Sequence, residues 1–244
     1  ENIAKAKLEM LRGLKKNGTI IINGDEPLLT EAAASDSRTK LTFGLENKEC
    51  DYLADSIFEL DGETDFVIRK KSGTIAANIG TIGLHNVYNA LAAAAVGEAA
   101  GLSDLEIVKG LAAFENTGAR QNIYDLGDIR LIDDTYNANP DSMRAALSVL
   151  KTFNAGKRIA VLADMLELGD YSGESHYDIG RLAADCCDML FVFGLHAAEY
   201  IRGAKDAGMG DRALLLPDPQ SIAEKLTETA YEGDTILFKG SRGM

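Results

Sequence analysis

Two adjacent carboxylates in "LIDDTYNANPDSM", residues 131–143, are the first candidates for chemistry. Asp133 and Asp134 end a short apolar run, and Asn139 and Pro140 then predict the N-cap and first position of a helix. A carboxylate beside a helix N-terminus can accept two hydrogen bonds from the vicinal hydroxyls of a ribose. The alternative is that one acid only caps the loop. The spacing alone leaves both possibilities open.

Two asparagines form a second candidate site in "GLHNVYNALAAAA", residues 83–95. Asn86 and Asn89 are three positions apart at a predicted helix start, so they share one face. Two amides on one face can pair with the donor and acceptor edge of adenine, as asparagine does in DNA. The alternative, which the spacing alone favours, is that Asn86 caps the helix and Asn89 is solvated. The nearby His85 has no obvious partner, which favours a structural role over a ligand.

A lysine inside an apolar row is the third candidate. Ile3, Met10 and Leu14 form a row at helical spacing, and Lys7 falls within it. A lysine at such a place usually buries its stem and keeps its ammonium group in water. The residues alone favour that interpretation over a functional lysine at a buried site.

The composition limits the classes of function. The chain has 244 residues, of which 46% are hydrophobic, which suits one large domain or two smaller ones. A net charge of −13 argues against a nucleic-acid partner, because phosphate backbones need a basic face. Cys50, Cys186 and Cys187 have neither disulfide-framework nor metal-site spacing and indicate a reducing compartment. The longest apolar run, 91–96, is far too short for a membrane span.

The second half of the sequence alternates strand-like and helical stretches. The predicted strands are 129–132, 158–163, 189–194, 213–217 and 235–238. The predicted helices lie near 140–152, 175–187, 196–207 and 219–230. Near-continuous apolar strands that alternate with helices indicate a doubly wound α/β domain, with a parallel sheet of about five strands. In such sheets, ligands bind beyond the carboxyl ends of the strands, where Asp133 and Asp134 are expected.

The first half is organised differently. It is expected to contain a helix over 3–14, a short buried strand at 19–23, a hairpin at Ser72-Gly73, a helix over 86–100 and a helix that opens with the capping-box pair Ser103 and Glu106. The polar, glycine-containing stretch 116–122 is predicted to link the two halves.

Six segments, in order along the whole chain, resemble the Mur ligase family. They are "ENIAKAKLEML", "GLHNVYNALAAAA", "GAR", "IDDTYNANPDSM", "VLADMLELG" and "FKGSRGM". The resemblance implies that residues 1–117 are the later part of a central ATP-binding domain and that 118–244 are a C-terminal Rossmann-like domain. It also implies a fragment, without the family's UDP-binding domain, phosphate loop, upstream magnesium ligands and terminal helix.

The resemblance assigns roles to five of these residues. Lys7 matches a lysine that family members carry as a carbamate, whose anionic oxygens suit Mg²⁺. Asn86 and Asn89 match asparagines near the adenine of ATP. Arg120 matches an arginine that reaches the nucleotide phosphates, and Asp134 matches the acid that binds the ribose. ATP would then be held from both halves and close them on one another.

The reaction implied by the resemblance is ATP-dependent amide formation through an acyl phosphate. "DDTYNANP" points to the family activity that adds D-alanyl-D-alanine to UDP-N-acetylmuramoyl-tripeptide in peptidoglycan synthesis, in the bacterial cytoplasm. Asn137, Asn139 and Ser241 are expected near the dipeptide site. The alternatives are another Mur-family or folylpolyglutamate-synthase-like ligase, or a non-catalytic binding module. The chain by itself is expected to be inactive.

Overall fold

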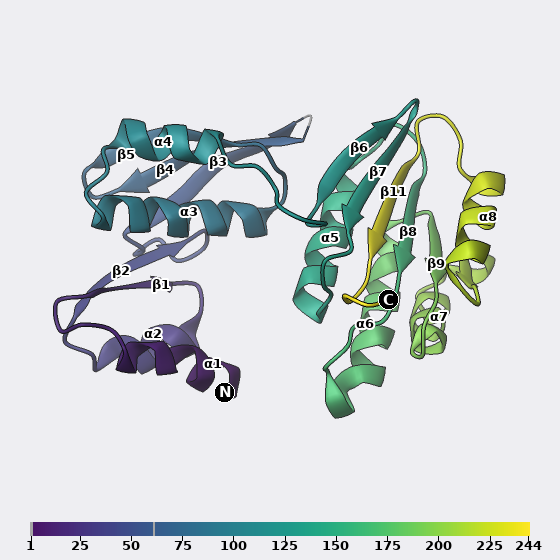
Figure 1. Ribbon diagram of the computed structural model, residues 1–244, viewed down its shortest axis with the longest axis horizontal. Coiled ribbons are helices and arrows are strands. Elements are labelled where there is room, and N and C mark those ends of the chain that lie inside the picture. The colour runs from purple at the N-terminus through teal and green to yellow at the C-terminus, as the bar shows by residue number, and fades with distance from the viewer. Residues whose placement is uncertain (1, 61) are drawn as a thin grey trace. The chain divides into compact units, whose positions relative to one another are not determined.

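The computed structural model describes residues 2–60 and 62–244. The chain forms two compact units, Glu1–Glu115 and Asn116–Met244, which we call unit 1 and unit 2 (Figure 1). The sequence analysis placed the domain boundary after residue 117. Among the described residues, no helix is both long and apolar enough to span a membrane.

Unit 1 contains a five-stranded mixed sheet in the order β1-β2-β3-β4-β5. The strands are β1 (Thr19–Asn23), β2 (Thr39–Gly44), β3 (Tyr52–Leu60), β4 (Glu63–Lys70) and β5 (Gly73–Ile79). β1, β2 and β3 pair in parallel, whereas β4 is antiparallel to both β3 and β5. The predicted hairpin is present, but its two-residue turn is Lys71-Ser72 rather than Ser72-Gly73, because Gly73 already pairs with Lys70 as the first residue of β5.

The helices of unit 1 are α1 (Asn2–Leu8), the 3-10 helix η1 (Glu9–Arg12), α2 (Pro27–Ala34), α3 (Leu84–Ala99) and α4 (Asp104–Ala112). Helices α2 and α3 pack against β1 from opposite faces, and α4 packs against β5. Strand alternation sends Ile20 and Ile22 toward Ala33 of α2 and sends Ile21 to the core under α3. The capping box at the start of α4 is confirmed, because the Glu106 carboxylate accepts the Ser103 N–H at 2.8 Å.

Unit 2 contains a six-stranded sheet in the order β10-β9-β8-β11-β7-β6. The strands are β6 (Asn122–Leu126), β7 (Ile129–Asp134), β8 (Arg158–Leu162), β9 (Met189–Val192), β10 (Ala213–Leu215) and β11 (Thr235–Lys239). All neighbours pair in parallel except β6, which is antiparallel to β7. The doubly wound α/β fold is therefore confirmed. The edge strand β6 was not predicted, because its polar sequence lacks a clear alternation.

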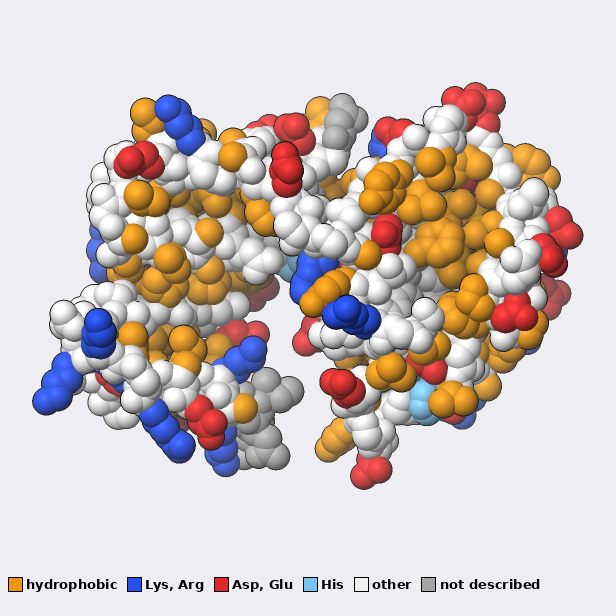
Figure 2. Space-filling model, in the orientation of Figure 1, with side chains coloured by type: hydrophobic (Ala, Val, Ile, Leu, Met, Phe, Trp, Pro, Cys, Tyr) orange, Lys and Arg blue, Asp and Glu red, His pale blue; other side chains and the backbone are white. Residues whose placement is uncertain are grey.

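The helices of unit 2 cover the two faces of the sheet unequally. They are α5 (Pro140–Thr152), α6 (Ser172–Cys186), α7 (Ala197–Asp206) and α8 (Pro219–Thr229), with short 3-10 turns η2 (Gly169–Tyr171) and η3 (Gly210–Arg212). α5, α6 and α7 lie on one face, and α8 packs alone on the other against Ile159, Val161 and Ile236 (Figure 1). A groove of about 340 Å³ beside α8 shows as a broad apolar area in Figure 2.

The fold brings three strand ends together in unit 2. β8, β11 and β7 are neighbours, so the residues that follow them share what we call the carboxyl edge of unit 2. The helices behind this edge approach closely. A Cβ atom on Gly180 of α6 would overlap the carbonyl group of Tyr200 in α7, and one on Gly203 would overlap that of Tyr177. Glycine at these positions therefore lets the two backbones touch.

Candidate functional site

The two adjacent acids at the end of β7 have different partners. Strand alternation turns them to opposite faces of the sheet. Asp133 Oδ1 accepts hydrogen bonds from the backbone N–H of Thr135 at 3.1 Å and from its hydroxyl at 2.7 Å. Asp133 is therefore the acid that caps the loop. Asp134 instead pairs with Lys239, whose Nζ lies 2.6 Å from its Oδ2.

Lys239 is a site residue that the sequence analysis did not single out. It ends β11, and the parallel register places it directly beside Asp134. Only 2% of its side chain is exposed, compared with 18% for Asp134. Its ammonium group also donates to the carbonyl oxygen of Asn137 at 3.0 Å. Lys239 thus holds both the carboxylate and the loop that follows it. The Asn137 side chain itself was predicted near the dipeptide, and that role stays a prediction.

Arg120 lies beside the same loop. Its guanidinium carbon is 3.9 Å from the centre of the Tyr136 ring, so the planar group stacks on the aromatic face. The Tyr136 N–H donates to the carbonyl of Ala119 at 2.8 Å, which ties the two segments together. Arg120 is exposed. The stack therefore restricts the guanidinium group while leaving it open to an anionic ligand.

Asn139 is confirmed as the N-cap of α5. Its side-chain oxygen accepts the Ser142 N–H at 2.8 Å, and the Ser142 hydroxyl accepts the Asn139 N–H at 3.0 Å. Pro140 occupies the first helical position, as predicted. The cap uses the amide oxygen of Asn139, so the predicted contact with a dipeptide would rest on its amide nitrogen.

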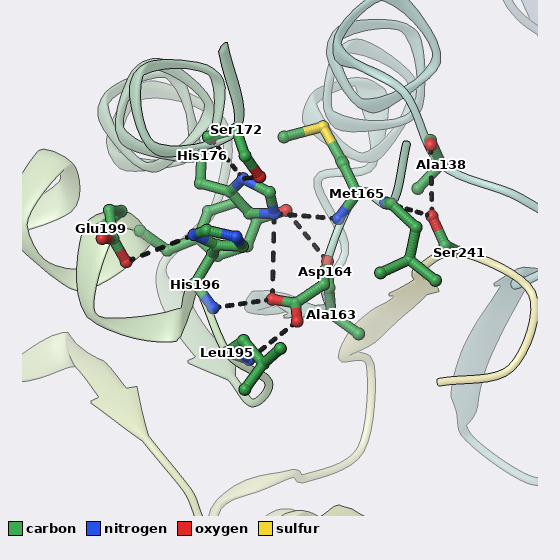
Figure 3. Close-up of polar contacts among 12 residues, drawn as sticks. Ala138, Ala163, Asp164, Met165, Ser172, His176, Leu195, His196, Glu199 and Ser241 are labelled. Atoms are coloured by element: carbon green, nitrogen blue, oxygen red, sulfur yellow. Dashed lines mark hydrogen bonds and ion pairs between the residues drawn. The ribbon is translucent and has the colours of Figure 1, made fainter. Parts of the chain in front are cut away.

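Ser241 is buried where the ends of β11 and β8 meet. Its hydroxyl oxygen accepts the Leu166 N–H at 2.9 Å, and its own N–H donates to the carbonyl of Asp164 at 3.0 Å (Figure 3). The residue is 4% exposed. Its hydroxyl also donates to the carbonyl of Ala138 at 3.4 Å. Ser241 was predicted near the dipeptide, and that role stays a prediction.

Asp164 and His176, which sequence reasoning missed, lie behind Ser241 (Figure 3). The Asp164 carboxylate accepts the N–H groups of Leu195 and His196 at 2.8 and 3.0 Å. The His176 Nε2 atom accepts the Met165 N–H at 2.9 Å. The sequence signal available for Asp164 was its place directly after a predicted strand. The hydrogen-bond partners of Asp164 and His176 are distant in the sequence, so the sequence did not indicate their contacts.

His176 is held in one neutral form by its neighbours. Because Nε2 accepts a hydrogen bond, Nδ1 carries the proton and donates to the carbonyl of Ser172 at 2.6 Å. The His196 ring stacks on it with centroids 4.6 Å apart. Burial lowers the pKa of His176, and His196 lowers it further, against the raising effects of the Ser172 hydrogen bond and of Asp164 and Glu199.

The lowered pKa of His176 predicts a pH dependence of stability. The folded protein holds this ring neutral, whereas the unfolded chain takes up a proton near pH 6.5. The contribution is therefore complete above pH 6.5 and declines as the pH falls from 6.5 toward the lower folded-state pKa. The urea concentration at the midpoint of unfolding should differ less between pH 7.5 and pH 5.5 in His176→Gln than in the wild-type protein. A His176→Gln variant whose midpoints differ between the two pH values as much as those of the wild-type protein would contradict the prediction.

In unit 1 the two asparagines of α3 line one cavity of about 260 Å³, as their spacing predicted. The Asn86 Nδ2 atom donates to the carbonyl of Ile82 at 2.9 Å and to the Thr81 hydroxyl at 3.1 Å. The prediction that Asn86 could be the N-cap is wrong, because α3 begins after Gly83 and Asn86 lies in its first turn. Asn89 is exposed, which agrees with solvation and also leaves its amide facing a ligand.

The rest of this cavity is mainly apolar. Its walls include Ile79, Ala90, Ile107, Leu111 and Phe114. Apolar walls with a few amide groups suit a flat heteroaromatic ring that has hydrogen-bonding edges. The composition of the cavity therefore fits an adenine base.

The prediction of a buried apolar row around Lys7 is wrong for the side chains that the structure describes. The side chain of Ile3 is not among them. Lys7 is exposed, and Met10 is 74% exposed. The reason is that α1 gives way to the 3-10 helix η1, which changes the periodicity. Leu11 and Leu14 pack against the small core of α2 and β1 instead. Lys7 therefore neither snorkels along a buried row nor lies at a buried site.

The residues that the structure describes do not by themselves fit a magnesium site. Over 2–60 and 62–244 there is no group of three or more His, Cys, Asp or Glu side chains that could hold a metal ion. Lys7 as a carbamate would supply only one ligand group. Its role with Mg²⁺ stays a prediction, and we derive no step through the metal.

The fold and the site define an α/β protein whose second unit is doubly wound and places Asp134, Lys239 and Ser241 at its carboxyl edge. The Mur ligase middle domain matches residues 1–97, and the model described as "Mur ligase, glutamate ligase domain" matches residues 119–242. The chain belongs to the Mur ligase family.

Two curated relatives and two solved structures extend this result. The UDP-N-acetylmuramoyl-tripeptide–D-alanyl-D-alanine ligases of Bacillus subtilis (strain 168) and Escherichia coli (strain K12) are 38% and 34% identical, over 100% and 98% of this chain. This chain spans 53% of each relative. A MurF structure from Acinetobacter baumannii has a TM-score of 0.88 at 32% identity, covering 98% of this chain and 52% of that one. MurF from Thermotoga maritima in complex with ADP has a TM-score of 0.84 at 26% identity, covering 98% and 54%.

Proposed function

We propose that this chain is the nucleotide-binding and acceptor-binding part of a ligase that uses ATP to add D-alanyl-D-alanine to UDP-N-acetylmuramoyl-tripeptide in the bacterial cytoplasm. The names of the curated relatives support this substrate pair. The observation that carries the nucleotide part is the cavity of unit 1, where two amides meet apolar walls. The chain spans about half the length of these relatives, so the proposal concerns the full-length gene product.

In this proposal the adenine base lies in the cavity of unit 1. Asn86 already uses its amide nitrogen to hold the carbonyl of Ile82, so its main task is to shape the wall. Within the described residues, the structure shows no hydrogen bond from the Asn89 side chain. Its amide can therefore offer a donor and an acceptor to the base. We therefore assign recognition of the base chiefly to Asn89.

The ribose and phosphates are assigned to unit 2. Lys239 bonds to Oδ2 of Asp134, which leaves Oδ1 as the oxygen for a ribose hydroxyl. Arg120, stacked on Tyr136, offers a planar donor fork for phosphate oxygens.

The acceptor chemistry follows from the same arrangement. ATP phosphorylates the terminal carboxylate of the tripeptide, the amine of the dipeptide attacks the acyl carbon, and phosphate leaves as the amide forms. Asn137, Asn139 and Ser241 belong to the carboxyl-edge region of unit 2 in which we place the dipeptide. Holding both reactants next to each other supplies much of the rate enhancement.

Substitution of Asn89 tests the nucleotide assignment. Asn89→Leu should weaken ATP binding by roughly tenfold or more, since a bidentate amide–base pair is worth about 1–3 kcal/mol. Calorimetric titration of ATP and the KM for ATP of the full-length gene product measure this. Asn78→Leu, in β5 of the same unit and outside the cavity, is the matched control. Equal affinities of the two variants would show that the base binds elsewhere.

A substrate panel on the full-length gene product tests the reaction. We expect ligation of D-alanyl-D-alanine to the UDP-linked tripeptide, with ATP consumed in proportion to product. Incorporation of single amino acids or glutamate without the dipeptide would instead support a related ligase. Nucleotide binding without any ligation would support a binding module.

A further inference from the structure

Ser241 is held from two sides: its hydroxyl donates to the carbonyl of Ala138 at 3.4 Å, and the loop between β8 and α6 holds it from the other side. This loop, residues 163–168, is joined to Ser241 by two hydrogen bonds: the Leu166 N–H donates to the serine hydroxyl, and the Ser241 N–H donates to the carbonyl of Asp164. A shift of the loop would therefore move or release the hydroxyl group. Residues that fix the loop therefore supply one of the two constraints on the Ser241 hydroxyl, the other being the carbonyl of Ala138.

Two buried side chains fix the loop from the opposite side (Figure 3). Asp164 is 1% exposed, and its carboxylate binds the two N–H groups that precede α7. His176 is 0% exposed and binds the Met165 N–H from α6. Hydrogen bonds to a buried carboxylate are among the stronger ones, because the charge has lost its water. The loop is therefore bound to both helices behind the sheet.

The backbone of the loop also adopts a conformation that needs such support. Glu167 has φ of 65°, in the left-handed region that non-glycine residues rarely adopt. A conformation of this kind costs roughly 1–2 kcal/mol and persists only where the surroundings enforce it. The hydrogen bonds of the two preceding residues, Met165 and Leu166, supply that constraint.

We propose that Asp164 and His176 are positioning residues for the acceptor substrate: through loop 163–168 they hold the Ser241 hydroxyl where the incoming dipeptide binds. The inference rests on the proposed function, which puts the dipeptide beside Ser241. Neither residue touches the substrate. Loss of either should therefore raise the KM for the dipeptide while the KM for ATP, set by other residues, stays near the wild-type value.

The chain offers a matched control at the other end of the same sheet. Asp234, 3% exposed, precedes β11, and its carboxylate accepts the N–H groups of Lys157 at 2.7 Å and Tyr231 at 2.9 Å. Asp234→Asn is thus the same chemical change, in an equally buried acid that also binds two N–H groups. Asp234→Asn should lower the stability of unit 2 as Asp164→Asn does. Asp234 lies at the opposite end of the sheet from loop 163–168, so its substitution should not move the loop.

The kinetic test compares four variants of the full-length ligase. We expect Asp164→Asn and His176→Met to raise the KM for the dipeptide by roughly tenfold or more, because small displacements of a positioning group have effects of this size or larger. Both should change the KM for ATP by less than about twofold. Asp234→Asn should leave both constants near wild type. His176→Gln keeps an acceptor for the Met165 N–H and should recover most of the loss.

A second measurement on the 244-residue chain is independent of activity. Hydrogen exchange should show the Leu166 amide protected in wild type and in Asp234→Asn, and deprotected in Asp164→Asn and His176→Met. Retained protection, or equal KM changes for both substrates, would overturn the positioning role. If wild type shows the expected protection but the full-length product does not ligate the dipeptide, the proposed function fails. The positioning of the acceptor then fails with it, and only the structural link remains.

Discussion

Replacing Lys239 by methionine is expected to lower the free energy of unfolding of unit 2 by about 3 kcal/mol. The substitution leaves the carboxylate of Asp134 without its counter-ion and the carbonyl of Asn137 without its donor. Breaking one side of a buried ion pair typically costs about 3–5 kcal/mol. Asp134 is 18% exposed and can regain some water, so the expected loss lies at the lower end of this range.

Urea unfolding followed by circular dichroism measures this loss, and hydrogen exchange assigns it to unit 2. Lys225→Met is the control, because its partner Glu228 is at 2.9 Å but the two side chains are much more exposed than Lys239 and Asp134, at 35% and 67%. Exposed pairs contribute about 0–1 kcal/mol. A loss in Lys239→Met no larger than that in the control would contradict the role of the ion pair.

A double variant separates stability from function at the same pair. Replacing a buried ion pair by apolar residues is often neutral or stabilising, so Lys239→Met with Asp134→Leu should recover much of the lost stability. The recovered protein would still lack the acid assigned to the ribose. Restored stability together with undiminished nucleotide affinity would exclude Asp134 from the nucleotide site.

Replacing Gly180 by alanine is expected to destabilise unit 2 by about 3 kcal/mol. The added Cβ would overlap the carbonyl group of Tyr200, which is backbone and cannot rotate away. Helices α6 and α7 would have to separate, and overpacking of this kind costs about 1–3 kcal/mol or more. His176 lies on α6, and His196 and Tyr200 lie at the start of α7, so the same shift would loosen the hydrogen bonds behind Ser241.

Gly173→Ala provides the control within the same helix. Nothing lies within 4 Å of a Cβ built there, so alanine should be neutral or stabilise α6 by roughly 0.5–1 kcal/mol. Thermal unfolding of both variants measures the contrast, with Leu166 amide exchange as the local readout. Similar melting temperatures for the two variants would mean that the helices can separate without cost.

Local patterns in the sequence were sufficient for most elements of unit 2. The helix over 140–152 agrees with α5 from Pro140 to Thr152, because an N-cap, a proline at the first position and apolar spacing all act within one helix. The strands β8, β9 and β11 carry apolar runs that are buried on both faces of the sheet. β6 has neither a helix-type capping signal nor a buried apolar run, and its pairing with β7 decides its structure. The row around Lys7 was wrong because a change to 3-10 geometry is set by packing.

The amino-acid sequence by itself determined where the polar candidates lie along each element, and it indicated the family through its ordered segments. Only the tertiary structure decided which atoms those candidates meet. Asp134 and Lys239 are 105 residues apart, and Asp164 and His196 are 32 apart. Such partners are chosen by strand order and register, and these depend on the burial of whole faces rather than on local propensity.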